Sequence, residues 1–190
     1  MLACRERQTT ILCERISPSH CQAKSASVTM GSRMALLYQI QEEIRLRTDE
    51  IVSAHGSWPC RKGCDDCCRH LASVPRITQA EWLLIASALD ALPDDAAECV
   101  RQRIRDSAGK SRPVVCPLLD SDSGACLVYD ARPLACRAYG FYAERREVLG
   151  CSRIESISEQ STEVVWGNHM ALEERTSSLG PTVELSEWLV

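Results

Sequence analysis

Apolar residues in the segment 34–56 recur with the spacing of an α-helix. Successive members of the set are three, four and seven residues apart, which places them on one helical face. The set comprises Leu37, Ile40, Ile44 and Ile51. Gly56 follows the last of them, and glycine commonly ends a helix. The pattern therefore predicts a long helix that begins at Met34 and buries this face.

Two further helices are predicted from capping residues and apolar periodicity. In the segment 77–93, Thr78 stands three residues before Glu81, which is the spacing of a capping box, and an apolar run follows. The segment 93–110 has acidic residues in its first turn and apolar residues along one side. Cys99 falls in this second helix, and we expect it to be a small buried core residue.

Residues 112–151 differ from the helical segments, because their apolar runs are short and are separated by turn residues. The sequence DSDSG predicts a turn, so we expect a hairpin between Cys116 and Tyr129. The stretch DARPLACRAYG predicts a short helix that is capped by Asp130 and ends at Gly140.

The C-terminal part is predicted to be helical again. The sequence SEQSTEVVWGNHMALEERTSSLGP predicts one longer helix that closes at Gly180 and Pro181, and VELSEWLV predicts a last short amphipathic turn. The fold class that follows is mainly α: a small helical domain with a short hairpin or irregular segment. We expect this single domain to span residues 34–190.

The first 33 residues look different from the rest. Residues 1–33 are rich in serine, threonine and small polar residues, so we expect a disordered tail. Translation that begins at Met30 or Met34 would exclude this tail from the protein. Three cysteines of the tail are expected to be incidental: Cys4, Cys13 and Cys21.

Charge and composition argue against two classes of partner. The formal net charge is −4 and aromatic residues make up 5% of the chain, so neither a basic nucleic-acid surface nor a base-stacking platform is expected. No stretch approaches the roughly 18 apolar residues of a membrane span, and charged residues interrupt the N-terminal segment where a secretory signal needs an apolar core. We therefore expect a cytoplasmic protein with reduced cysteines that binds neither nucleic acid nor membranes. The sequence indicates no particular protein partner.

Twelve cysteines are the unusual feature of the chain. In a reducing compartment, a dense cysteine cluster is more often metal-binding or catalytic than disulfide-bonded. Four of the cysteines lie close together: Cys60, Cys64, Cys67 and Cys68. If residues 59–68 form a helix that starts at Pro59, the four thiols share an arc of roughly 100° and can face one or two metal ions. Gly63 weakens this helix, so a helical turn that runs into a loop is the alternative.

A second set of four cysteines is dispersed further along the chain: Cys116, Cys126, Cys136 and Cys151. Eight thiolates are enough for two four-coordinate metal sites, or for one site and a redox pair. Thiolate ligands select zinc, iron–sulfur clusters or copper(I) over magnesium and calcium. Arg132, Arg137 and Lys62 would offset part of the negative charge.

The spacing Cys60-x3-Cys64-x2-Cys67 also matches the iron–sulfur loop of radical S-adenosylmethionine enzymes. Those enzymes continue in a series of strand–helix units, whereas the remainder of this chain is predicted to be mainly helical. The adjacent Cys68 is also foreign to that motif, so we do not favour this class.

The segments CRKGCDDCC and CPLLDSDSGACLVYDARPLACRAYG, followed by Cys151, resemble the YkgJ-type cysteine-cluster family, which is described as a zinc- or iron-chelating domain. The resemblance covers roughly residues 56–151 and implies that they form a metal-binding core. It implies these metal ligands: Cys60, Cys64, Cys67, Cys68, Cys116, Cys126, Cys136 and Cys151. Five more residues of the family pattern are expected to support the ligands or to pack around them: Tyr129, Arg132, Pro133, Arg137 and Tyr139.

The function that this resemblance implies is chelation of zinc or iron, the latter including an iron–sulfur cluster. A related cysteine cluster occurs in flagellin lysine N-methylases, so a methylase-like or other metal-dependent enzyme is one alternative. An enzyme would need an open coordination position beside Arg137 or Tyr139, and no glycine-rich S-adenosylmethionine loop follows a predicted strand. The other alternative is a metal-free thiol redox module. His70 and His169 are the weaker candidate ligands.

Overall fold

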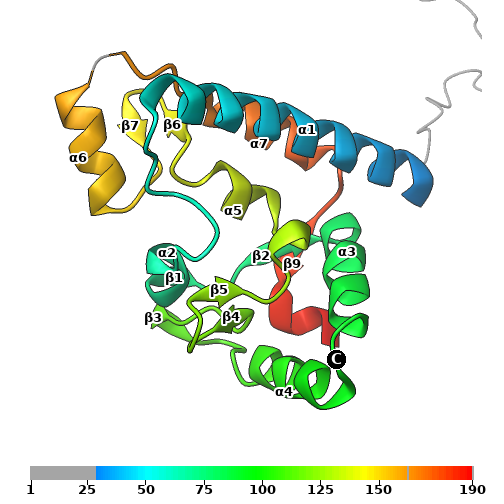
Figure 1. Ribbon diagram of the computed structural model, residues 1–190. Helices are drawn as coiled ribbons and strands as arrows, with labels where there is room; N and C mark the ends of the chain where they lie inside the picture. Colours follow the sequence, from blue (N-terminus) through cyan, green and yellow to red (C-terminus); the bar gives the residue numbers. More distant parts are fainter. Residues whose placement is uncertain (1–28, 162, 190) are drawn as a thin grey trace, which may run out of the picture.

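The computed structural model describes residues 29–161 and 163–189, so most of the predicted tail and its three cysteines lie outside the described residues. The fold is mainly helical and carries small sheets, which confirms the predicted fold class at this level (Figure 1). The helices and 3-10 turns are α1 Met30–His55, α2 Asp66–Arg69, α3 Gln79–Asp90, α4 Asp94–Arg105, η1 Tyr129–Ala131, α5 Leu134–Ala138, α6 Ser152–Gln160, α7 His169–Ser177 and η2 Leu185–Leu189. The strands are β1 Leu71–Ser73, β2 Arg76–Thr78, β3 Ser111–Val114, β4 Leu119–Asp120, β5 Ala125–Cys126, β6 Tyr142–Glu144, β7 Glu147–Val148, β8 Gly167–Asn168 and β9 Thr182–Glu184.

The long first helix is confirmed, and it begins four residues earlier than predicted, at Met30. Its buried face consists of the four predicted apolar residues: Leu37, Ile40, Ile44 and Ile51. Thr29 caps the N-terminus, where its hydroxyl accepts a hydrogen bond from the Ser32 N–H at 3.3 Å. Gly56 ends the helix with a φ of 69°, a conformation that costs glycine little.

The next two helices are also confirmed, with one error in burial. The capping box at the start of α3 is complete, because the Thr78 hydroxyl accepts from the Glu81 N–H and the Glu81 carboxylate accepts from the Thr78 N–H. On α4, Val100 and Ile104 are buried as the periodicity indicates. Cys99 is exposed, so the prediction that it is a core residue is wrong. It precedes Val100 directly, and adjacent helical positions point in different directions.

The hairpin of the middle segment is confirmed, since β4 and β5 pair antiparallel with Leu119 opposite Cys126. The predicted cap of the following helix is wrong. Asp130 belongs to the 3-10 turn η1, and α5 starts after Pro133, whose fixed φ suits the residue before a helix.

One long C-terminal helix over residues 158–181 is not formed, which corrects the prediction. Instead α6 ends at Gln160, the chain extends into β8, and α7 starts at His169. Gly167 explains the break, because its N–H donates to the Phe141 carbonyl at 3.0 Å and a Cβ there would lie 2.5 Å from the Tyr142 ring. The final amphipathic turn is confirmed as η2.

Two hydrophobic cores hold the elements together. The first, which we call the α1 core, comprises Leu37, Ile40, Ile44, Ile51, Trp58, Ala80, Leu134, Ala138, Phe141, Tyr142, Ile154, Val164 and Leu179. The second, the α3–α4 core, comprises Val74, Ile77, Ile85, Leu89, Val100, Ile104, Val114, Cys116, Leu118, Leu119, Val128 and Leu185. Figure 1 shows α1, α6 and α7 on one side of the molecule, α4 and the small sheets β1–β3 and β4–β5 on the other, and α5 between them. Both cores therefore reach the region that the cysteine-bearing segments occupy.

Candidate metal centre

The first four cysteines lie on a loop and a single helical turn. A continuous helix over residues 59–68 is not formed, and α2 begins only at Asp66. Gly63 adopts a φ of 88°, which is incompatible with a right-handed helix and explains the error. Cys60 and Cys64 consequently sit in a loop that runs into the helical turn α2, which is the reverse order of the alternative of a helical turn that runs into a loop.

Trp58 anchors the start of this loop. It is buried, and its indole N–H donates to the Gly140 carbonyl at 3.1 Å. Its ring also stacks on Phe141 and lies against Trp166, each with 5.7 Å between centroids. Aromatic contacts of this kind fix the geometry of a segment. The loop that carries Cys60 is thereby held to the segment after α5.

Gly140 makes room for the first thiol. Its φ is 84°, and a Cβ built on it would lie 2.3 Å from the Cys60 Sγ. A side chain at this position would therefore collide with the sulfur. The glycine that was predicted to end a helix has a second use, because it lets the backbone approach a candidate ligand.

Cys60, Cys64 and Cys151 form one neighbourhood, on the α1 core. Cys60 and Cys151 pack against that core, and Cys151 precedes the first residue of α6. Arg153, in the first turn of α6, donates a hydrogen bond to the Cys64 Sγ at 3.4 Å. Burial raises the pKa of Cys60 to about 12, and the thiols of Cys64, Cys151 and Cys67 add to the effect.

Cys68, Cys116 and Cys126 form a second neighbourhood, on the α3–α4 core. Cys116 is a buried member of that core, and the other two cysteines pack against it. The Cys116 N–H donates to the Cys68 carbonyl at 2.7 Å, so α2 is fastened to the segment after β3. A hydrogen bond with Cys116 is the main cause that raises the pKa of Cys68 to about 12.

Cys67 and Cys136 lie between the two neighbourhoods. The Cys67 Sγ is 4.0 Å from the Cys68 Sγ, and this contact is the main cause of a raised Cys67 pKa. Burial raises the pKa of Cys136 to about 12, with further effects from Cys68, Cys67 and Cys126. Both residues line two cavities, one of about 300 Å³ with several arginines and one of about 270 Å³ with mainly apolar walls. Their thiols can thus be approached from two sides.

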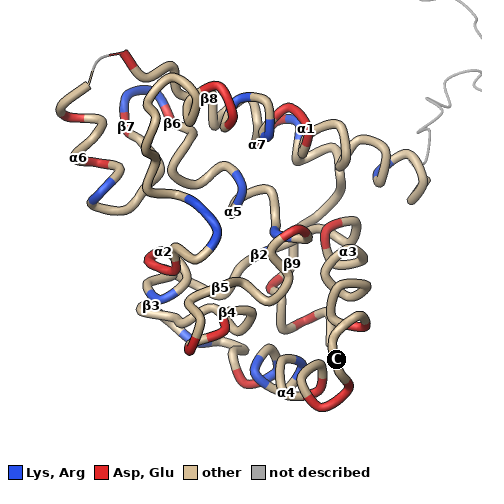
Figure 2. The backbone as a smooth tube through the Cα atoms, viewed as in Figure 1, with Lys and Arg blue, Asp and Glu red and all other residues tan. Residues whose placement is uncertain are grey.

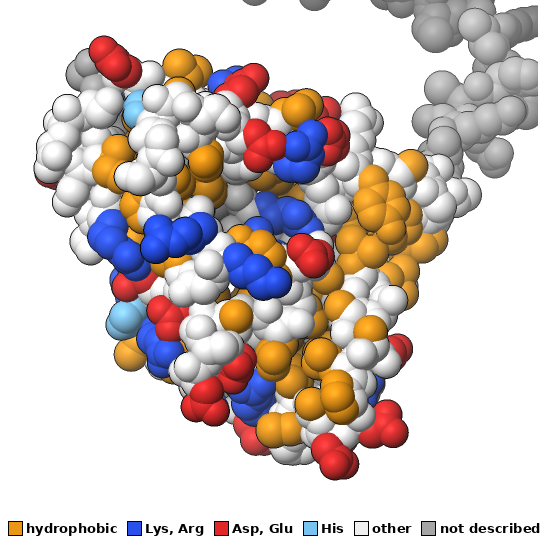
Figure 3. All heavy atoms as spheres, in the orientation of Figure 1, with side chains coloured by type: hydrophobic (Ala, Val, Ile, Leu, Met, Phe, Trp, Pro, Cys, Tyr) orange, Lys and Arg blue, Asp and Glu red, His pale blue; other side chains and the backbone are white. Residues whose placement is uncertain are grey.

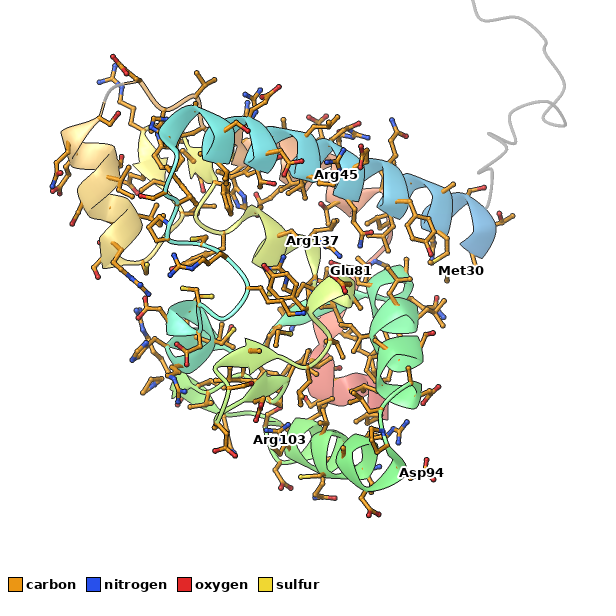
Figure 4. All side chains as sticks on the ribbon, viewed as in Figure 1. Met30, Arg45, Glu81, Asp94, Arg103 and Arg137 are labelled. Atoms are coloured by element: carbon orange, nitrogen blue, oxygen red, sulfur yellow. The ribbon has the colours of Figure 1, made fainter. Side chains whose placement is uncertain are left out.

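A buried glutamate positions the helix that carries Cys136. Glu81, labelled at the start of α3 in Figure 4, is 4% exposed. One carboxylate oxygen accepts hydrogen bonds from the Thr78 N–H and hydroxyl, and the other accepts from the Leu134 N–H at 2.9 Å. The capping box therefore also fixes the first residue of α5, which the sequence pattern does not reveal.

The cysteines fit a thiophilic metal in their chemistry, because sulfur ligands suit zinc and iron. Within residues 29–161 and 163–189, no group of three or more His, Cys, Asp or Glu side chains is arranged to hold a metal ion as it stands. Raised pKa values keep the thiols of Cys60 and Cys136 protonated at neutral pH, and a protonated thiol is a poor ligand. A metal bound by these cysteines would take the place of those protons, because the thiolate is the ligand.

The two histidines that the sequence raised as weaker ligands are engaged elsewhere. His70 is exposed, and its Nδ1 lies 2.9 Å from the Asp66 carbonyl oxygen. His169, on α7, lies 3.3 Å from a Glu173 carboxylate oxygen.

Fold and site together define a small, mainly helical domain whose cysteines come from separate segments and gather beside two cores. The family model CxxCxxCC, described as "Putative zinc- or iron-chelating domain", matches residues 59–168, and the chain belongs to this family. The resemblance recognised in the sequence is thereby confirmed. No curated protein and no solved structure gives a significant match. In the part of the chain that the structure describes, none of the helices has the length and apolar character needed to cross a membrane.

Proposed function

We propose that the protein chelates zinc or iron through eight cysteines arranged as two four-thiolate groups. The first group is Cys60, Cys64, Cys67 and Cys151. The second group is Cys68, Cys116, Cys126 and Cys136. The observation that carries the grouping is the division of the cysteines between two cores, with Cys60 and Cys151 on the α1 core and Cys68, Cys116 and Cys126 on the α3–α4 core.

Cys67 and Cys136 complete the groups. Cys67 raises the pKa of Cys60, so it is close enough to join the first group. Cys68 and Cys126, which belong to the second group, add to the rise in the pKa of Cys136 that burial causes. All four members of each group are thiols, and four soft ligands suit zinc or an iron–sulfur cluster.

Charge balance supports the same proposal. Eight thiolates around two divalent ions leave about four negative charges, because each ion cancels two. Arg153 donates to the Cys64 sulfur in the first group. A cation that offsets part of the remaining charge is therefore hydrogen-bonded to one of the sulfurs.

The test is metal and acid-labile sulfide content after purification without oxygen. We expect Cys60→Ser and Cys136→Ser each to lose metal relative to the wild type. Cys99→Ser is the matched control, because Cys99 is exposed on α4 and lies outside both groups. Iron with sulfide and a brown colour would identify an iron–sulfur protein, and colourless protein with zinc would identify a zinc protein. Full metal content in both variants would refute the ligand assignment.

The grouping needs variants that leave the fold intact. Cys151→Ser is suitable, because Cys151 is the residue before α6 and serine is a favoured helix cap. We expect Cys151→Ser and Cys126→Ser each to remove the metal of one group, and the double variant to remove both. If either single variant empties both groups while the protein remains folded, the cysteines form one joint centre instead of two.

A further inference from the structure

A cavity beside the cysteines is lined by four arginines, three of which have no acidic partner among the residues that the structure describes. The cavity has a volume of about 300 Å³ and is bounded by α1, the loop before α2, η1 and α5. Three arginines of this region line it: Arg61 in the loop, Arg132 directly after η1 and Arg137 on α5. Cysteines of both proposed groups line it as well. In Figure 2 blue positions mark the loop before α2 and α5, and in Figure 3 basic side chains form a band across the middle of this face.

The three arginines differ from the fourth arginine of the cavity, Arg45 on α1. The Arg45 guanidinium is neutralised by its own helix, 2.5 Å from Asp49 and 2.6 Å from Glu42. Among residues 29–161 and 163–189, no carboxylate oxygen lies within 4.0 Å of a guanidinium nitrogen of the other three. Figure 4 labels Arg45 on α1 and Arg137 on α5. The side of the cavity away from α1 therefore carries positive charge that no described carboxylate neutralises by an ion pair.

Backbone contacts hold two of these guanidinium groups in place. Arg132 lies over the Tyr129 ring at 3.5 Å, and its Nε donates to the Tyr129 carbonyl at 2.9 Å. The Arg137 Nε donates to the Arg132 carbonyl at 2.9 Å, and its Nη2 donates to the Asp130 carbonyl. Each side chain is thus fixed by part of its donors, and the remaining N–H groups are available to a ligand.

This arrangement carries an electrostatic cost. Arg132 and Arg137 line the same cavity and carry like charges, and the hydrogen bond from the Arg137 Nε to the Arg132 carbonyl holds the two residues together. Two guanidinium groups that repel each other at a cavity wall are typical of a site that receives an anion. Compensation of thiolate charge is the competing explanation. Of the described arginines, however, only Arg153 donates a hydrogen bond to a cysteine sulfur, whereas Arg132 and Arg137 donate to carbonyl oxygens.

We infer that this cavity binds a small oxyanion, either a carboxylate or a phosphate group, between Arg61, Arg132 and Arg137. A planar guanidinium offers paired N–H donors that match the two oxygens of such groups. The volume corresponds to a small ligand. That the anion lies beside a metal rests on the proposed function, whereas anion binding itself rests on the arginines.

The experiment is calorimetric titration of the metal-loaded full-length protein with inorganic phosphate and, separately, with acetate, in a chloride buffer. We expect saturable binding of one probe, and the tighter probe identifies the phosphate or the carboxylate class. The double variant Arg132→Gln/Arg137→Gln should bind about tenfold more weakly or worse. Arg146→Gln is the matched control, because it removes the same charge from an exposed position outside the cavity and should leave binding unchanged.

The anion site would be overturned if neither probe binds the wild type saturably, or if the wild type and the double variant bind with equal affinity. A folded double variant that has lost its metal would also overturn it, because the arginines would then serve the thiolates. Arg61→Gln keeps the test decisive if the double variant does not fold, since Arg61 is an exposed loop residue whose loss should still weaken binding. Metal content measured on the same samples separates this test from the proposed function, which fails if the wild type holds no metal.

Discussion

Gly140→Ala is the sharpest test of how the fold serves the first cysteine group. The new Cβ would lie 2.3 Å from the Cys60 Sγ, so the sulfur has to move by roughly 1 Å or more to reach an ordinary contact. Metal–sulfur bonds tolerate errors of about 0.2 Å. Alanine at a φ of 84° also costs about 1–2 kcal/mol of stability, whatever surrounds it. The variant should therefore be less stable and should also lose the metal of the first group.

Gly109→Ala separates the two effects. Gly109 has a φ of 66°, and a Cβ added there meets no atom within 4 Å, so this variant carries the backbone cost without a collision. Gly109→Ala should melt roughly 2–8 °C below the wild type, as expected for about 1–2 kcal/mol in a chain of this size, and Gly140→Ala should melt lower still because it adds the collision with Cys60. Only Gly140→Ala should lose metal when bound metal is counted after treatment with a mild chelator. Equal metal content in the two variants would refute the role of Gly140.

Two further predictions concern stability. Glu81→Gln should lower the free energy of unfolding by about 1.5–3 kcal/mol, because an amide cannot accept hydrogen bonds from both Thr78 and Leu134 as the buried carboxylate does. Urea unfolding measures this free energy. The exposed control Glu98→Gln should change it by less than about 0.5 kcal/mol. The metal-free protein should lose stability as pH rises from about 8.5 towards 12, because the folded thiols of Cys60 and Cys136 have pKa values of about 12 whereas unfolded thiols ionise near 8.5. A urea midpoint that stays constant or rises between pH 8 and pH 10 would contradict this reasoning.

Local signals account for what the sequence predicts correctly. The buried face of α1 follows from the spacing of its apolar residues, and the capping box follows from two residues three positions apart. The errors arise where tertiary contacts decide. The helix predicted over residues 158–181 is interrupted because the backbone of Gly167 packs on Tyr142, a residue that the local pattern does not include.

The candidate ligands follow the same rule. Cysteine spacing and family resemblance select eight thiols, but they do not indicate which thiols share a metal. The grouping depends on contacts between distant segments, such as Arg153 with Cys64 and Gly140 with Cys60. The indole N–H of Trp58 likewise ties the cysteine loop to Gly140. Such contacts have no sequence signature, because each joins residues that are far apart in the chain.

The raised pKa values of the cysteines also indicate how metal and fold depend on each other. Burial favours the neutral thiols of Cys60 and Cys136. The metal-free fold is therefore most stable at a pH below the pKa of an unfolded cysteine. A metal needs the thiolate and gains affinity as pH rises, because fewer protons must be displaced. Rising pH therefore weakens the metal-free fold while it strengthens metal binding. It follows that the stabilisation by metal should be largest on the alkaline side, where the uncharged thiols of Cys60 and Cys136 no longer favour folding.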